Sequence, residues 1–176
     1  LFIDIPGNPL GTYLPSDAIE YLVRHTPEHV LLVIDEAYYE YVQATDYCSA
    51  VTFLRERENL LIMRSFSKAY GLASFRIGYA IGALSVIEYI HRVRDPFNVN
   101  QPAQRAALAA LDDTSFLQES VACNESGKKI LEEAFANWKA KGVTWNRSET
   151  NFLTLRTPVH ADLIYQNLLD EGVITR

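Results

Sequence analysis

The lysine at position 68 is the clearest candidate for chemistry in this sequence. Lys68 follows the apolar run 60–63, has Ser65 and Ser67 just before it, and is followed eight residues later by Arg76. A lysine amine can bind a carbonyl compound covalently, and an arginine with neighbouring hydroxyls can hold a phosphate by charge-assisted hydrogen bonds. The combination predicts a site for a carbonyl cofactor that carries a phosphate. Taken singly, Lys68 and Arg76 would be solvated surface residues, as most lysines and arginines are.

Asp35 is the second candidate, because it directly follows the apolar and β-branched run 30–34. An acid at the carboxyl end of a buried strand is costly unless it meets a cation. A protonated pyridine nitrogen is such a cation, and a carboxylate that keeps it charged lets the ring accept electrons. The alternative is an acid that caps a loop. Glu36 is interpreted as a solvated or structural acid.

Short apolar runs alternate with helical patterns in the first part of the chain. Strands are predicted at residues 1–5, 30–34, 60–63 and 77–81, and a helix begins near Ser16. This order is typical of an α/β fold with a mostly parallel sheet and flanking helices. Ligands of such sheets bind beyond the carboxyl ends of the strands, which is where the polar candidates lie.

The second part of the chain has a different pattern. Helices are predicted over 84–94 and 101–111, a long amphipathic helix starts at Thr114, strands are predicted at 143–145 and 152–155, and a last strand is predicted from Val173. We therefore expect residues 1–113 to be part of a large α/β domain and residues 114–176 to be part of a smaller α+β domain. No linker-like segment separates the two, so we expect them to share an interface.

Composition excludes several classes of protein. The 176 residues include 16 basic and 22 acidic side chains, a net charge of −6 that disfavours nucleic acid and anionic membranes. No apolar run approaches the roughly 18 residues that span a bilayer. Cys48 and Cys123 lie far apart without CxxC spacing or a histidine cluster, so we expect neither a disulfide framework nor a metal site. A cytoplasmic location is the resulting expectation.

Several segments resemble the fold-type-I pyridoxal-phosphate aminotransferases. The segment 65–79 resembles their cofactor-binding lysine segment, and the turn 6–12 is similar to their Asn-Pro-x-Gly turn. Five residues match the family order with similar gaps, namely Asn8, Asp35, Tyr38, Lys68 and Arg76. The resemblance implies part of the large fold-type-I domain, part of the small C-terminal domain, and pyridoxal 5'-phosphate as cofactor.

The resemblance also implies a role for each matching residue. Lys68 would bind the cofactor covalently and transfer the substrate proton, and Asp35 would face the pyridine nitrogen. Asn8 and Tyr38 would hydrogen-bond the phenolic oxygen of the ring. The cofactor phosphate would be held by Arg76 with Ser65 and Ser67. The catalytic residues implied are thus Lys68, Asp35 and Tyr38.

Four further segments look like the histidinol-phosphate aminotransferase branch of this family, namely 38–41, 95–100, 148–153 and 170–176. In that branch an arginine after Gly-Val-Ile contacts the substrate phosphate, which points to Arg176; a terminal arginine without a role is the equal alternative. The implied reaction converts L-histidinol phosphate and 2-oxoglutarate to imidazole acetol phosphate and L-glutamate, for histidine biosynthesis, in a homodimer.

Two alternatives stay open at this point. The same cofactor site serves aromatic aminotransferases and threonine-phosphate decarboxylases, whose substrate choice depends on other residues. The chain could also be a non-catalytic fragment, since the resemblance covers a central and C-terminal part of longer proteins. We expect residues 1–176 alone to be aggregation-prone or partly folded and to show no transamination, because groups that orient the substrate lie outside them.

Overall fold

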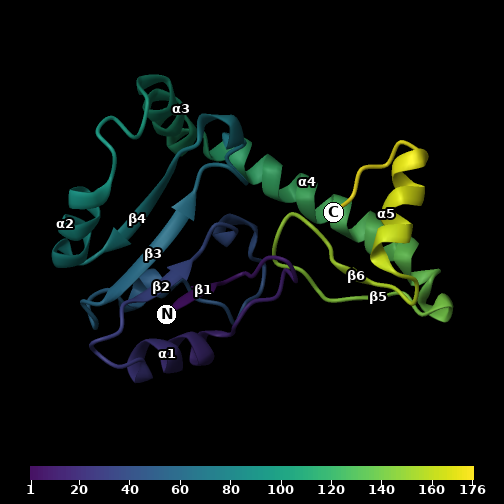
Figure 1. The fold of residues 1–176 in the computed structure, drawn as a ribbon, viewed down its shortest axis with the longest axis horizontal. Coiled ribbons are helices and arrows are strands. Elements are labelled where there is room, and N and C mark those ends of the chain that lie inside the picture. Colours follow the sequence, from purple (N-terminus) through teal and green to yellow (C-terminus); the bar gives the residue numbers. More distant parts are fainter.

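A four-stranded sheet lies at the centre of the first part of the chain in the computed structural model, which describes residues 1–176. The strands are β1 (Phe2–Asp4), β2 (Leu32–Asp35), β3 (Leu60–Ser65) and β4 (Gly78–Gly82), and they lie in this order across the sheet (Figure 1). β1 and β3 both pair with β2 in parallel, so the predicted mostly parallel sheet is confirmed.

β4 runs antiparallel to β3, a direction that the sequence pattern did not specify. A parallel connection needs a long crossover, usually a helix. The connection 66–77 contains only the 3-10 turn Ala73–Phe75, so the chain returns alongside β3 in the opposite direction. This return brings Arg76 back to the carboxyl end of β3, where Gly78 is the partner of Ser65.

The apolar core lies on one face of the sheet. Alternate residues of β2 and β3 point to this face, as the two-residue period of a strand requires. Helix α1 (Ser16–His25) covers them with Ile19 and Val23, which are four residues apart and therefore on one side of the helix. The buried residues of this core are Ile5, Ile19, Val23, Leu32, Ile34, Ala50, Leu60 and Ile62.

Helices dominate the chain after β4. They are α2 (Leu84–Val93), α3 (Gln101–Asp112), α4 (Thr114–Ala136) and α5 (Ala161–Asp170), and the hairpin strands are β5 (Thr144–Trp145) and β6 (Leu155–Arg156). The Asp113 carboxylate accepts the Phe116 N–H at 3.0 Å, so this residue caps α4 directly after α3 ends. Figure 1 shows α4 running from the sheet toward β5, β6 and α5. The division into domains at this point stays a prediction.

The predicted last strand from Val173 is wrong. Residues 173–176 form no regular structure and are exposed. A strand is stable only when a neighbouring edge accepts its hydrogen bonds, and none of the six strands pairs with these residues.

None of the helices is both long and apolar enough to cross a membrane.

Candidate active site

The carboxyl ends of β2 and β3 gather most of the predicted site residues. Asp35 ends β2, Ser65 ends β3, and Arg76 lies two residues before β4. With Ser67 they line a cavity of about 310 Å³, whose other walls are Ala37, Met63, Arg64, Ile77 and Gly78. This volume is at the lower end of the range of about 300–1,000 Å³ for small-molecule sites.

The cavity has hydroxyl and guanidinium donors on the side of the segment 65–76. The Ser67 N–H donates to Ser65 Oγ at 3.0 Å, which closes the turn after β3. Arg76 adopts a left-handed backbone conformation with φ of 53° and donates from Nη1 to the Ala73 carbonyl at 2.9 Å. A non-glycine residue held in this region costs on the order of 1–3 kcal/mol, and such residues cluster at functional sites.

Asn8, Tyr38 and Lys68 form a second group at the same end of the sheet. Asn8 Nδ2 donates to Tyr38 Oη at 3.2 Å, and Lys68 Nζ lies 5.2 Å from the centroid of the Tyr38 ring. The backbone N–H of Asn8 donates to Asp4 Oδ2 at 2.7 Å, which fixes the turn that presents its side chain. Tyr38 is buried, and it lies between the other two side chains, with its hydroxyl toward Asn8 and its ring near Lys68.

The Asp35 carboxyl is partly buried and has no ion-pair partner within the chain. Its Oδ1 accepts the Ala37 N–H at 3.0 Å. Burial raises the pKa of this carboxyl, and the negative charges of Asp4 and Glu36 act in the same direction; the Ala37 N–H and the Lys68 ammonium oppose them. A cationic ligand atom would therefore stabilise the ionised form of Asp35. Such an environment is expected of a carboxyl group that binds a cation.

A buried ion pair next to the site was not predicted from the sequence. Glu36 is 1% exposed, and its Oε2 accepts hydrogen bonds from Arg64 Nε at 3.1 Å and Nη2 at 2.9 Å. Ser49 Oγ and the Ala50 N–H donate to the same carboxylate at 2.8 to 2.9 Å. Glu36 is thus structural rather than solvated, and the pair joins β2 to β3 beside Asp35 and Ser65. The available signal was an acid and an arginine at the ends of two consecutive buried strands.

Arg176 is the one predicted site residue that the structure does not bring to this end of the sheet. It is exposed, it follows α5 by six residues, and none of the ion pairs or hydrogen bonds of the chain involves its side chain. It does not line the 310 Å³ cavity.

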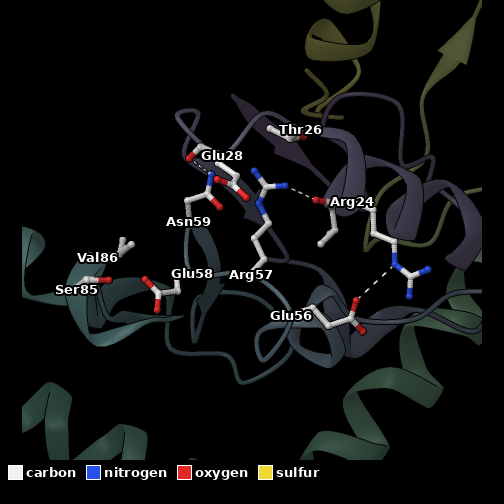
Figure 2. Close-up of a pocket in the computed structure, with 10 residues that line it drawn as sticks. Arg24, Thr26, Glu28, Glu56, Arg57, Glu58, Asn59, Ser85 and Val86 are labelled. Carbon is white, nitrogen blue, oxygen red and sulfur yellow. Dashed lines mark hydrogen bonds and ion pairs between the residues drawn. The ribbon is translucent and has the colours of Figure 1, made fainter.

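A larger cavity of about 690 Å³ lies at the opposite ends of the strands. Figure 2 shows its charged lining. Glu56 pairs with Arg24 at 3.4 Å, and Arg57 donates to main-chain carbonyls in the last turn of α1 and in the loop after it. Asn59 Nδ2 likewise donates to the Glu28 carbonyl at 2.6 Å. These side chains hold the loops together, and the ligands of parallel sheets bind at the other end.

A lysine, an acid and phosphate-type donors thus lie together at the carboxyl end of the sheet, the arrangement expected of a fold-type-I pyridoxal-phosphate enzyme. The family described as "Aminotransferase class I and II" matches residues 1–176. The chain therefore belongs to the class I and II aminotransferases, a family that depends on pyridoxal phosphate.

Curated relatives lie within one branch of the family. Over its full length the chain is 44% identical to "Histidinol-phosphate aminotransferase 2" of Pseudomonas aeruginosa and covers 47% of that protein. It is 42% identical over 171 residues to the histidinol-phosphate aminotransferase of a Geobacillus species, covering 97% of this chain and 46% of the relative. The chain thus spans about half the length of the curated relatives it matches.

Solved structures confirm the predicted fold class. The histidinol-phosphate aminotransferase of Sinorhizobium meliloti in complex with pyridoxal-5'-phosphate matches with a TM-score of 0.91 and 30% identity, over 99% of this chain and 48% of that one. The enzyme of the same name from Clostridium acetobutylicum matches with a TM-score of 0.86 and 25% identity, over 99% of this chain and 53% of that one.

Proposed function

We propose that the protein containing this chain is a pyridoxal-phosphate-dependent aminotransferase that converts L-histidinol phosphate and 2-oxoglutarate to imidazole acetol phosphate and L-glutamate in histidine biosynthesis. The observation that carries the proposal is the convergence of Lys68, Asp35 and Tyr38 at the carboxyl ends of β2 and β3. Relatives at 42 to 44% identity that carry this name support the choice of substrate.

The donor set fits the cofactor. Arg76, Ser65 and Ser67 offer the charged and hydroxyl donors that a phosphate needs, in the same cavity wall. Asp35 lines that cavity and has no cation of its own, so it suits a protonated pyridine nitrogen. When bound, pyridoxal phosphate supplies a ring that takes up the negative charge left on a substrate carbon that has lost a proton.

Lys68 performs the covalent and acid–base work in this proposal. Its Nζ would hold the cofactor through the cofactor's carbonyl carbon and would be freed when a substrate amine replaces it there. The freed Lys68 amine would accept the proton from the substrate carbon as general base and would return it as general acid. The Tyr38 ring, 5.2 Å from Nζ, limits where this amine can move.

Asn8 and Tyr38 would orient the ring by hydrogen bonds to its phenolic oxygen. Both groups are polar, and in the structure they already contact each other at 3.2 Å, so each can turn a hydrogen bond toward a third oxygen at little cost. Asp35 would hold the pyridine nitrogen by its charge. The Glu36–Arg64 ion pair keeps Asp35 and Ser65 at a fixed separation by joining their strands.

We also propose the division at residues 113 and 114, a role for Arg176 in binding the substrate phosphate, a homodimer, and a cytoplasmic location. The support for these four points is the resemblance to the family. Light scattering of the whole protein measures the oligomeric state directly.

The deciding experiment is a turnover assay of the whole protein. It should be loaded with pyridoxal phosphate and offered L-histidinol phosphate, phenylalanine or threonine phosphate with 2-oxoglutarate, while glutamate and carbon dioxide are measured. We expect glutamate, with the largest kcat/KM for histidinol phosphate. A preference for phenylalanine, or release of carbon dioxide from threonine phosphate, would replace the proposed substrate. A protein that forms no borohydride-sensitive absorbance band would not be an enzyme of this class.

A further inference from the structure

The segment 148–154 lies between α4 and the site, and it contacts two elements of the site. Its residues Ser148, Glu149 and Thr150 are buried although all three are polar. Burial of a carboxylate is costly unless its oxygens are paired. The contacts of Glu149 therefore show which parts of the site its side chain and main chain hold in place. The role inferred for Glu149 rests on the proposed function.

The first element that the segment holds is the turn that carries Asn8. The Glu149 N–H donates to the Gly11 carbonyl at 2.8 Å, and Thr154 Oγ1 donates to the Pro9 carbonyl. Gly11 has φ of +71°, and a Cβ atom there would lie only 2.2 Å from Ser148 Oγ. The turn and the segment therefore fit each other closely at the residues that directly follow Asn8.

The second element is the loop that follows Tyr38. Glu149 Oε2 accepts the N–H groups of Gln43 at 2.6 Å and Ala44 at 3.2 Å. The other carboxylate oxygen pairs with Arg147 Nε at 3.0 Å, but the Arg147 side chain is 72% exposed, so the pair contributes little by itself. Phe152 packs edge-on against the Tyr38 ring, with centroids 5.5 Å apart.

Helix α4 fixes the far side of the segment. Lys128 Nζ donates to the Ser148 carbonyl at 2.7 Å, and Asn124 Nδ2 donates to the Thr150 carbonyl at 3.1 Å. Lys128 also pairs with Glu125 at 2.6 Å, which keeps its buried ammonium compensated. The segment is thus held from behind while it contacts the site in front.

We propose that Glu149 is a positioning residue of the site. Its main chain holds the turn of Asn8 and its carboxylate holds the loop of Tyr38, so one residue sets the separation of the two side chains that meet at 3.2 Å. Glu149 does not line the 310 Å³ cavity, and it acts on the phenolic oxygen of the cofactor only through Asn8 and Tyr38.

The test compares four variants of the whole protein, namely Glu149→Ala, Glu149→Gln, Thr154→Val and Arg147→Ala. Amide hydrogen exchange at Gln43 and Ala44 reports the hold on the loop and requires no cofactor. The pH midpoint of the absorbance band of the bound cofactor reports the groups at its phenolic oxygen. Thr154→Val removes only the contact to Pro9, so it perturbs the turn of Asn8 even if Glu149→Ala does not fold.

We expect Glu149→Ala to speed exchange of both amides by roughly tenfold or more, because two bonds to a buried carboxylate are lost. We also expect it to shift the pH midpoint of the band. Glu149→Gln should behave nearly as wild type, since an amide oxygen can accept both N–H groups. Arg147→Ala should change neither measurement, and Thr154→Val should shift the band alone.

Two results would overturn the proposal. Faster exchange in Glu149→Ala with an unchanged band, together with an unchanged band in Thr154→Val, would make the segment merely structural. An equal effect of Arg147→Ala would assign the hold to the exposed ion pair. Failure of the proposed function gives a different result, because the wild-type protein would then show no cofactor band at all while the exchange rates of the variants still differed.

Discussion

Residues 1–113 and residues 114–176 are stabilised by different kinds of contact. Every buried apolar side chain belongs to the first part, where strands and α1 enclose it. The buried residues of the second part are Lys128, Ser148, Glu149 and Thr150, all polar. Apolar burial is non-directional and supplies most of the free energy of folding, whereas hydrogen bonds depend on direction. The first part therefore provides most of the stability of the fold. The buried polar residues of the second part fix the positions of the segments that they contact.

The same division separates the residues predicted to form the site from those that influence its affinity and geometry. Seven of the eight predicted site residues lie in the first part, and Arg176 alone lies in the second. Substitutions in the first part should abolish activity or stability, whereas substitutions in the second should change affinity and geometry. Variants in both parts test this contrast, and the largest effect is expected at Lys68.

Replacement of Lys68 by alanine should reduce kcat by several orders of magnitude, because the amine proposed to bind the cofactor and to transfer the proton is lost. Borohydride reduction followed by peptide mass spectrometry should place the pyridoxyl group of the wild-type protein on Lys68. The matched control is Lys129→Ala, which removes an exposed lysine of α4. An adduct on any other lysine would contradict the assignment.

Replacement of Asp35 by asparagine should slow proton abstraction by orders of magnitude while leaving the fold and the attachment of the cofactor largely intact. The side chains have the same shape, but the amide cannot hold the pyridine nitrogen protonated. Single-turnover kinetics with deuterated substrate measure this step. Near-normal turnover would show that Asp35 has only a structural role.

Truncation of Ile34 to alanine should lower the free energy of unfolding by about 2–5 kcal/mol, because Ile34 is buried in the core of the sheet. The matched truncation in the second part is Leu163→Ala, at a side chain that is 56% exposed. We expect this change to stay within about 0.5 kcal/mol. Urea unfolding of both variants measures the difference, and equal losses would contradict the contrast between the two parts.

Asp35 should also make the cofactor-free protein less stable as pH rises. Its pKa is raised above the ordinary 3.8 by burial in the folded state, so the folded protein keeps the proton over a range where the unfolded chain loses it. The stability contributed by the protonated form is complete below pH 3.8 and is lost as pH rises through the raised pKa. Asp35→Asn should remove this loss and be more stable than wild type near neutral pH, but not in acid below the ordinary pKa, in urea titrations without cofactor.

The positions of these residues could be predicted from the sequence because the relevant signals are local. A buried strand is a short apolar run, and Asp35 and Ser65 follow such runs directly, so their location at one edge of the sheet required only that the strands be parallel. The helices α2 and α3 and the start of α4 were predicted within a few residues for the same reason, since their apolar period is contained in each segment.

Contacts between distant segments could not be predicted in this way. Glu149 and Gln43 are 106 residues apart in the sequence. The periodicity of apolar residues within a segment does not indicate that the Glu149 carboxylate will accept the Gln43 N–H group. The Glu36–Arg64 pair and the reversed direction of β4 also depend on which strands become neighbours. The predicted strand at Val173 failed because an apolar run indicates a strand only if an edge is available to pair with it.

Replacement of Arg176 should have the smallest effect of these changes. It also tests the contrast between the two parts most directly, because a role for Arg176 would place substrate binding in the second part. Its side chain is exposed and makes no ion pair, so Arg176→Ala should change the free energy of unfolding by less than about 0.5 kcal/mol. If it binds the substrate phosphate, KM for histidinol phosphate should rise by about tenfold, the equivalent of about 1.4 kcal/mol, with kcat unchanged.

The increase in KM should shrink at high salt, because an exposed charge pair is screened. Histidinol without its phosphate should react equally well with both proteins. Arg156→Ala, at an exposed arginine of β6, is the matched control for loss of a positive charge in the same part of the chain. An equal rise in KM in both variants would reduce Arg176 to a contribution to the general electrostatic field. The substrate contacts would then have to come from groups other than the arginine that follows Gly-Val-Ile.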